Sequence, residues 1–123
     1  MALEITETLS GPITVLALRG RITLGDGTQV LRNRVTLALD NAKWQKERWG
    51  WNLCLILDLA QVDFMDSAGL GALVGIYATA RHQEAKMRLA NLTKMLQEQL
   101  VITKLSTVFE VYNSVEEAKA SCG

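Results

Sequence analysis

Residues 53–59, Leu-Cys-Leu-Ile-Leu-Asp-Leu, form an almost unbroken apolar run in the middle of the chain. A run of this kind is typical of a strand that is covered on both faces, as in a sheet flanked by helices. A mixed stretch, residues 60–65, follows it, and then come Asp66 and Ser67. Both are good N-cap residues, because their side-chain oxygens can accept from the free N–H groups of a first helical turn. The stretch therefore predicts a buried strand, a loop of several residues and a helix that begins near Ser67.

Strand and helix patterns alternate through the rest of the chain. An apolar–polar alternation over 3–9 and an apolar run over 13–18 flank a Ser-Gly-Pro turn, which predicts an antiparallel hairpin. The alternation of patterns favours an α/β fold for one domain, residues 1–123, with a small mixed sheet opened by this hairpin and about four helices. The later elements predicted are a helix from about residue 28 to about residue 46 or beyond, a strand over 86–92, a helix begun by Asn91 or Thr93 that contains Met95, Leu96 and Leu100, a strand over 107–112 and a capped helix over 114–120.

Composition excludes several classes of protein. The 13 basic and 13 acidic residues balance, and no Lys/Arg cluster stands out, so a nucleic-acid binder is disfavoured. The N-terminus has no basic segment before an apolar one, and the apolar stretch 68–80 is too short to span a bilayer. We therefore expect no secretory signal and no direct membrane insertion.

Cys54 and Cys122 make no disulfide framework, so both are predicted to be reduced thiols in a cytoplasmic protein.

The helix that follows Ser67 has two contrasting sides. Leu70, Leu73, Val74 and Tyr77 recur at i, i+3, i+4 and i+7, the stripe expected to face the sheet. The other side carries no charge and is a candidate docking surface, unless another element of the same chain covers it. The sequence leaves these two interpretations even. The residues of this side are Ala68, Gly71, Ala72, Gly75, Ile76 and Thr79.

Enzyme chemistry at Ser67 is disfavoured by the position of His82, which is the one histidine of the chain. Fifteen residues of helix separate the two side chains by roughly 22 Å at about 1.5 Å per residue. A nucleophile and its base need a separation of about 3 Å. A hydrolase that uses Ser67 is therefore the weaker interpretation, and we expect no enzyme.

Cofactor and metal sites are also disfavoured. The glycines from Gly69 onward do not fit the dinucleotide pattern, because the third glycine, Gly75, comes one position too late. There is no phosphate-binding P-loop motif and no Cys/His cluster with metal-ligand spacing. Three carboxylates, Asp58, Asp63 and Asp66, could chelate Mg²⁺, although solvation of the loop and capping of the helix are the simpler interpretation. We expect no cofactor.

The residues Asp58-Leu59, Val62 and Phe64-Met65-Asp66-Ser67-Ala68-Gly69-Leu70-Gly71 resemble the signature of the STAS domain. More narrowly, they resemble the bacterial anti-sigma factor antagonists, in which the serine of the Asp-Ser-x-Gly-Leu motif is phosphorylated by the partner. The likeness extends from about Leu3 to Ser121, and its diagnostic part is this central motif. It implies a STAS fold and a non-enzymatic switch protein.

The resemblance implies that the unphosphorylated protein binds an anti-sigma factor and so frees a sigma factor. The anti-sigma factor, a serine kinase, would release the protein after phosphorylating Ser67, and a serine phosphatase would reset it. We expect a monomer or weak dimer. The alternatives are a STAS scaffold subunit of a signalling assembly or of a lipid-transport ABC complex. The residues expected to contact the partner are Thr23, Asp26, Asp63, Asp66, Ser67, Ala68, Gly71, Ala72, Gly75 and Ile76.

Two features depart from the family pattern. The family shows Asp or Asn after Gly-x-Leu/Ile, near the phosphorylated serine, whereas this chain has Thr23 after Gly20-Arg21-Ile22; Asp26 could compensate. The segment 43–51 is also longer than the usual family connection and carries three tryptophans. These tryptophans are predicted to pack inside the protein, with a partner or self-association patch as the alternative.

Overall fold

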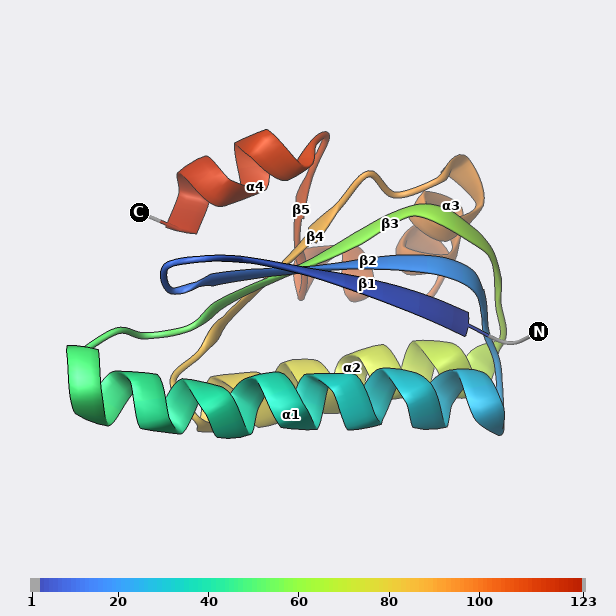
Figure 1. The fold of residues 1–123 in the computed structure, drawn as a ribbon. Helices are drawn as coiled ribbons and strands as arrows, with labels where there is room; N and C mark the ends of the chain where they lie inside the picture. The colour runs from blue at the N-terminus through green and yellow to red at the C-terminus, as the bar shows by residue number, and fades with distance from the viewer. Residues whose placement is uncertain (1–2, 123) are drawn as a thin grey trace.

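The computed structural model describes residues 3–122, which form a five-stranded sheet with helices on both faces (Figure 1). After the first two strands, helices and strands alternate as the sequence predicts. The elements are, in chain order, β1 (Leu3–Ser10), β2 (Ile13–Ile22), α1 (Asp26–Trp49), β3 (Cys54–Met65), α2 (Ser67–His82), β4 (Lys86–Ala90), α3 (Lys94–Ile102), the 3₁₀ turn η1 (Leu105–Thr107), β5 (Glu110–Tyr112) and α4 (Val115–Cys122).

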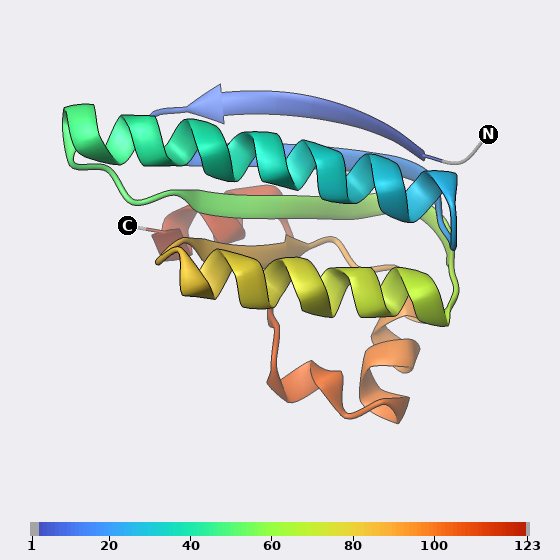
Figure 2. The ribbon, with the colours of Figure 1, turned by 90° about the horizontal axis from the view of Figure 1, so that it is seen from below.

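The sheet has the strand order β1-β2-β3-β4-β5. Strands β1 and β2 pair antiparallel, and every later pair is parallel. Helices α1 and α2 lie side by side on one face, and α4 lies on the other (Figures 1 and 2). This arrangement confirms the predicted mixed α/β fold with an N-terminal hairpin. Because β2 and β3 run in the same direction, their C-terminal ends meet at one edge of the sheet, beside the start of α2.

The main core lies between the sheet and the two long helices. Leu55, Leu57 and Leu59 of β3 are fully buried there. Leu73 of α2 is buried against them, which confirms the predicted sheet-facing stripe of that helix. A smaller cluster fills the other face, beneath α4, and consists of Val15, Ile56, Ala90 and Ala118.

Strand β3 is longer than the sequence predicts, since it continues to Met65 with no intervening loop. Two irregularities in its pairing with β2 each place one extra residue in β3, between Asp58 and Gln61 and between Val62 and Phe64. Such β-bulges change which face each following residue points to. The buried positions Leu59, Val62 and Met65 are therefore spaced by three, a pattern that does not match the two-residue repeat of a regular strand.

The prediction of two reduced thiols is wrong, because Cys54 and Cys122 form a disulfide. Helix α4 crosses the second face of the sheet and brings Cys122 beside the start of β3, with 5.9 Å between the two Cα atoms. A separation of 68 residues gives no sequence signal for this contact, which depends on where the last helix packs.

The predicted internal packing of the tryptophans is also wrong. Helix α1 continues to Trp49 and ends at Gly50, whose φ of 74° is the left-handed conformation that glycine adopts readily. Its last turns extend past the hairpin end of the sheet (Figure 1). Trp44 and Trp49 are therefore each 54% exposed, and Trp51 is 38% exposed.

The strand predicted over 107–112 begins only at Glu110, because residues 105–107 form the turn η1. Within residues 3–122, the helices are all too short or too polar to cross a membrane.

Candidate functional site

The candidate site is the corner where β3 passes into α2. Asp66 stands between the two elements in an extended conformation and caps α2. One oxygen of its carboxylate, Oδ1, accepts from the backbone N–H of Gly69 at 2.8 Å. The other, Oδ2, accepts from the backbone N–H of Leu24 at 3.1 Å. Asp66 therefore joins the start of α2 to the turn between β2 and α1.

These hydrogen bonds change the acidity of Asp66. The N–H of Gly69, and then that of Leu24, lower the pKa of the carboxyl group below its ordinary value of 3.8. Donors that point at a carboxylate favour its charged form. Asp66 is thus a fixed negative charge directly beside Ser67 at neutral pH.

Glycine is required at two positions of this corner. A Cβ atom on Gly69 would overlap the carbonyl oxygen of Ile22, at the end of β2. A Cβ atom on Gly27 would lie 2.6 Å from the carbonyl oxygen of Arg21. Both helices therefore begin in direct contact with the end of the β2 backbone, which fixes the position of the first turn of α2.

Ser67 is exposed at the first residue of α2. Of the two N-cap candidates, Asp66 takes that role, and among residues 3–122 the Ser67 hydroxyl has no hydrogen-bond partner. The hydroxyl is therefore accessible to solvent and free of hydrogen bonds to the described residues.

The uncharged side of α2 is partly buried and partly exposed. Ala72 and Ile76 are buried within the chain, so the covered-helix interpretation holds for these two residues. Ser67, Gly71, Gly75 and Thr79 remain exposed and recur every four residues, which places them on one stripe along the helix. We call this set the small-residue stripe. A Cβ atom added to Gly71 or Gly75 would meet no atom within 4 Å, so the stripe is open.

A groove of about 240 Å³ runs beside this stripe, between α1 and α2. Its floor is apolar, and its two sides come from one face of each helix. The groove continues the stripe away from Ser67 toward the end of α2. The residues that line it are Arg32, Val35, Thr36, Leu39, Gly75, Ile76 and Thr79.

The remaining residues predicted for the site lie at or near the corner. Ala68 is half-buried, in the first turn of α2. Thr23 is half-buried in the turn after β2, and its carbonyl oxygen accepts from the N–H of Thr28 at 3.0 Å. Asp26 is exposed at the first residue of α1, and Asp63 is exposed on β3. These residues therefore lie on four segments: the turn after β2, the first turn of α1, the last part of β3 and the first turn of α2.

Two residues of the corner were not predicted. Leu24 contributes only its backbone N–H, which no side-chain pattern reveals. Gln99 of α3 donates from Nε2 to the carbonyl oxygen of Met65 at 2.9 Å and so supports the end of β3. It comes from 34 residues further along the chain, and its neighbours in sequence point to nothing beyond an ordinary amphipathic helix.

Asp58, at the start of the motif, also has a hydrogen-bonding role. Asp58 Oδ1 accepts from the backbone N–H of Ala60 and from Nδ2 of Asn91, each at 3.1 Å.

Over residues 3–122, no group of three or more His, Cys, Asp or Glu side chains is placed to hold a metal ion. His82 is the last residue of α2 and lies at the opposite end of that helix from Ser67.

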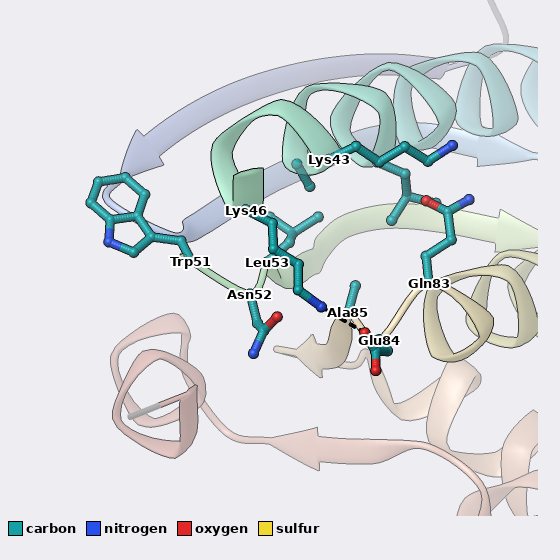
Figure 3. A pocket seen from close by; sticks show the side chains of 10 residues that line it. Lys43, Lys46, Trp51, Asn52, Leu53, Gln83, Glu84 and Ala85 are labelled. Atoms are coloured by element: carbon teal, nitrogen blue, oxygen red, sulfur yellow. Dashed lines mark hydrogen bonds and ion pairs between the residues drawn. The ribbon is translucent and has the colours of Figure 1, made fainter. Parts of the chain in front are cut away.

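A small hollow of about 40 Å³ lies at that opposite end, between the last turns of α1 and α2 (Figure 3). Two of its lining residues, Lys46 and Glu84, form an ion pair with 2.6 Å between Nζ and Oε1. The buried Oε1 atom of Gln83 lies on its wall without a protein partner. At about 40 Å³ the hollow is far smaller than an ordinary ligand pocket, so it is no candidate substrate site.

Residues 5–118, almost the whole chain, match the family model of the STAS domain. The chain belongs to the STAS domain family. A curated relative is the anti-sigma-B factor antagonist of Listeria monocytogenes, 36% identical over 61 residues, which are 50% of this chain and 54% of that protein. This STAS chain spans about half the length of the curated relatives it matches.

Solved structures share this STAS fold. An anti-sigma factor antagonist from Mycobacterium paratuberculosis has a TM-score of 0.78 and 15% identity, with 98% of this chain and 94% of that one covered. The Bacillus cell fate determinant SpoIIAA in its phosphorylated form has a TM-score of 0.68 and 18% identity, with 98% of each chain covered. At these identities the likeness shows the fold alone.

Proposed function

We propose that this STAS protein is an anti-sigma factor antagonist, and that phosphorylation of Ser67 switches off its binding to the anti-sigma factor. The observation that carries the proposal is the free, exposed Ser67 hydroxyl at the start of α2, where Asp66 has taken the capping role. A kinase can reach this hydroxyl without unfolding any element. The name of the Listeria relative supports the role, as does the fold shared with SpoIIAA, which has been solved in a phosphorylated form.

The switch acts through charge and bulk. A phosphate on Ser67 adds about 1.5 to 2 negative charges at pH 7. The N-terminus of α2 tolerates this charge, so the fold stays intact. The ionised Asp66 beside it adds to the negative potential, and a partner surface that fits a neutral hydroxyl rejects the product.

The docking surface in this proposal is the corner together with the small-residue stripe. Its contacting residues are Thr23, Asp26, Asp63, Ser67, Ala68, Gly71 and Gly75. Three other predicted residues act indirectly. Asp66 fixes the corner, and the buried Ala72 and Ile76 belong to the packed side of α2.

The partner in this proposal is an anti-sigma factor that is itself a serine kinase, and a serine phosphatase resets the protein. The chain acts as a non-enzymatic regulator in the cytoplasm. The distance between Ser67 and His82 along α2, roughly 22 Å at about 1.5 Å per residue, leaves the serine without a histidine base.

The test is a paired measurement with the serine-kinase anti-sigma factor encoded nearest this gene. Ser67→Ala should bind it like the parent, because the surface stays neutral, whereas Ser67→Asp should bind at least tenfold more weakly. Ser106→Asp, at an exposed serine of η1, is the matched control and should bind normally. Equal affinity of Ser67→Asp and the parent overturns the switch.

A second arm tests the modification itself. The kinase with Mg-ATP should add one phosphate to the parent protein and none to Ser67→Ala, as seen by mass spectrometry. If no phosphate reaches Ser67 although the two proteins bind each other, the protein is a constitutive STAS scaffold.

A further inference from the structure

Helix α4 is held on the second face of the sheet by a small apolar contact. It is eight residues long, and Ala118 is its one fully buried residue. Ala118 packs on Val15, Ile56 and Ala90, and the partly buried Val115 and Cys122 of the same helix pack against this cluster. An isolated helix of this length is unstable in water, so the order of α4 depends on what attaches it to the sheet.

The attachment at its C-terminal end combines a disulfide with two hydrogen bonds. Cys122 is linked to Cys54 of β3. Nearby, Arg88 Nε donates to Ser121 Oγ at 3.0 Å, and Lys86 Nζ donates to the carbonyl oxygen of Cys122 at 3.4 Å. The disulfide is thus the main link that keeps this end of α4 against β3.

We propose that the Cys54–Cys122 disulfide is a redox-sensitive latch. Its reduction by a dithiol lets α4 leave the sheet, which exposes the apolar patch formed by Val15, Ile56 and Ala90. The patch lies on the face opposite α1 and α2 (Figure 1). The latch therefore controls a surface separate from the Ser67 corner, and it does not depend on the function proposed for that corner.

The two sulfur atoms differ in accessibility, which sets the order of the exchange. Cys54 is only 2% exposed, whereas Cys122 is half-buried near the end of the chain. A thiolate of the dithiol attacks Sγ of Cys122, the S–S bond breaks, and its electron pair leaves on Sγ of Cys54, which takes up a proton. The second thiol of the reductant then displaces Cys122 as a thiol. Two electrons and two protons have passed to the protein, and the reductant leaves as its own disulfide.

Hydrogen exchange measured by mass spectrometry on the full chain tests the latch, with dithiothreitol as the dithiol. After reduction, the backbone amides of α4 should exchange at least tenfold faster, and reoxidation with glutathione disulfide should restore their protection. The amides of α2 should be unchanged. Equal exchange of α4 before and after reduction overturns the proposal. So does the finding that both cysteines of the purified protein are free and that glutathione disulfide cannot join them.

Two variants separate the disulfide from the neighbouring hydrogen bonds. Cys122→Ser should show the fast exchange of α4 with and without dithiothreitol. Ser121→Ala removes the hydrogen bond from Arg88 but keeps the disulfide, so its α4 should stay protected until the reductant is added. If Ser121→Ala loses protection without reductant as fully as Cys122→Ser does, the disulfide is not the latch.

Discussion

Asp66 accepts a hydrogen bond from the backbone N–H of Leu24 at 3.1 Å, across 42 residues of sequence. This bond joins the turn that follows β2 to the residue immediately before Ser67. The other carboxylate oxygen of Asp66 caps α2 through Gly69. One side chain therefore sets both the start of the helix and the position of the turn beside it.

Removing the Asp66 carboxylate should destabilise the protein. Asp66→Ala loses the cap of α2 and also the bond to the N–H of Leu24. Asp66→Asn should cost less, because asparagine is an equally good N-cap residue. Urea denaturation of the parent and both variants measures the difference. Asp63→Ala, at an exposed carboxylate of β3, is the control and should stay within about 0.5 kcal/mol of the parent. An Asp66→Ala variant as stable as Asp63→Ala would contradict the corner geometry.

The contribution of Asp66 should disappear in acid. Its pKa in the folded protein lies below 3.8, because the N–H groups of Gly69 and then Leu24 stabilise the charged form. A carboxyl group with a depressed folded-state pKa adds stability that is complete above its unfolded pKa and is lost as the pH falls through its folded pKa. The stability advantage of the parent over Asp66→Asn should therefore shrink below about pH 4 and be constant above about pH 5. Urea denaturation across this pH range measures the stability advantage. An advantage that grows as the pH falls would show that folding raises the pKa of Asp66.

Alanine should have opposite effects at Gly69 and Gly71, two glycines that are separated by a single residue. At Gly69 the new methyl group overlaps the Ile22 carbonyl oxygen and lies 2.8 Å from Cγ of Met65, so Gly69→Ala should cost about 1–3 kcal/mol. At Gly71 the methyl group meets nothing within 4 Å, and Gly71→Ala should stabilise the helix by about 0.5–1 kcal/mol. Thermal melts of the two variants test the pair. A Gly69→Ala variant as stable as the parent would mean that the first turn of α2 does not touch the end of β2, and a destabilised Gly71→Ala would mean that this position is not open.

Periodicity predicted the parts of the fold in which side chains repeat regularly. The apolar run around Leu55 became the central strand, and Leu73 became a buried residue of α2. Periodicity failed where the backbone departs from its regular repeat. The bulges on either side of Val62 shift the buried positions, so the end of β3 looked like a loop.

The sequence also identified Ser67 and Asp66 as the centre of the candidate site, because a polar pair directly after a strand and before an apolar stripe indicates a helix start. It could not show which of the two caps the helix, since that depends on side-chain conformation. Nor could it show the N–H of Leu24, the amide of Gln99 or the proximity of Cys54 to Cys122. These contacts join segments that only the packed fold brings together.

The tryptophans at the end of α1 should contribute little to stability. Trp49 is 54% exposed and stacks on Trp51, with ring centroids 5.9 Å apart, so Trp49→Lys should change the free energy of unfolding by less than about 1 kcal/mol. Leu73→Ala, at a residue that is 1% exposed, is the contrasting variant and should cost about 2–5 kcal/mol. Urea denaturation compares the two. A loss at Trp49 as large as that at Leu73 would show that this end of α1 is packed in solution.

Added bulk on the small-residue stripe should separate partner binding from stability. Gly75 is exposed in α2, and a side chain there meets nothing within 4 Å. Gly75→Gln should raise the melting temperature, since glutamine favours helix by about 0.5–1 kcal/mol over glycine. It should also weaken binding of the anti-sigma factor at least tenfold, because the partner must approach the backbone closely at this position. The change adds no charge, so it tests shape alone.

The matched control for this variant is Ala78→Gln, which places the same side chain at another exposed position of α2. It should leave the affinity unchanged, because Ala78 lies off the stripe. Isothermal titration with the anti-sigma factor, together with a thermal melt of each variant, gives both quantities. If Gly75→Gln binds as tightly as the parent while Ser67→Asp does not, the partner contacts the corner but not the stripe. If both variants bind normally, neither surface is the docking site.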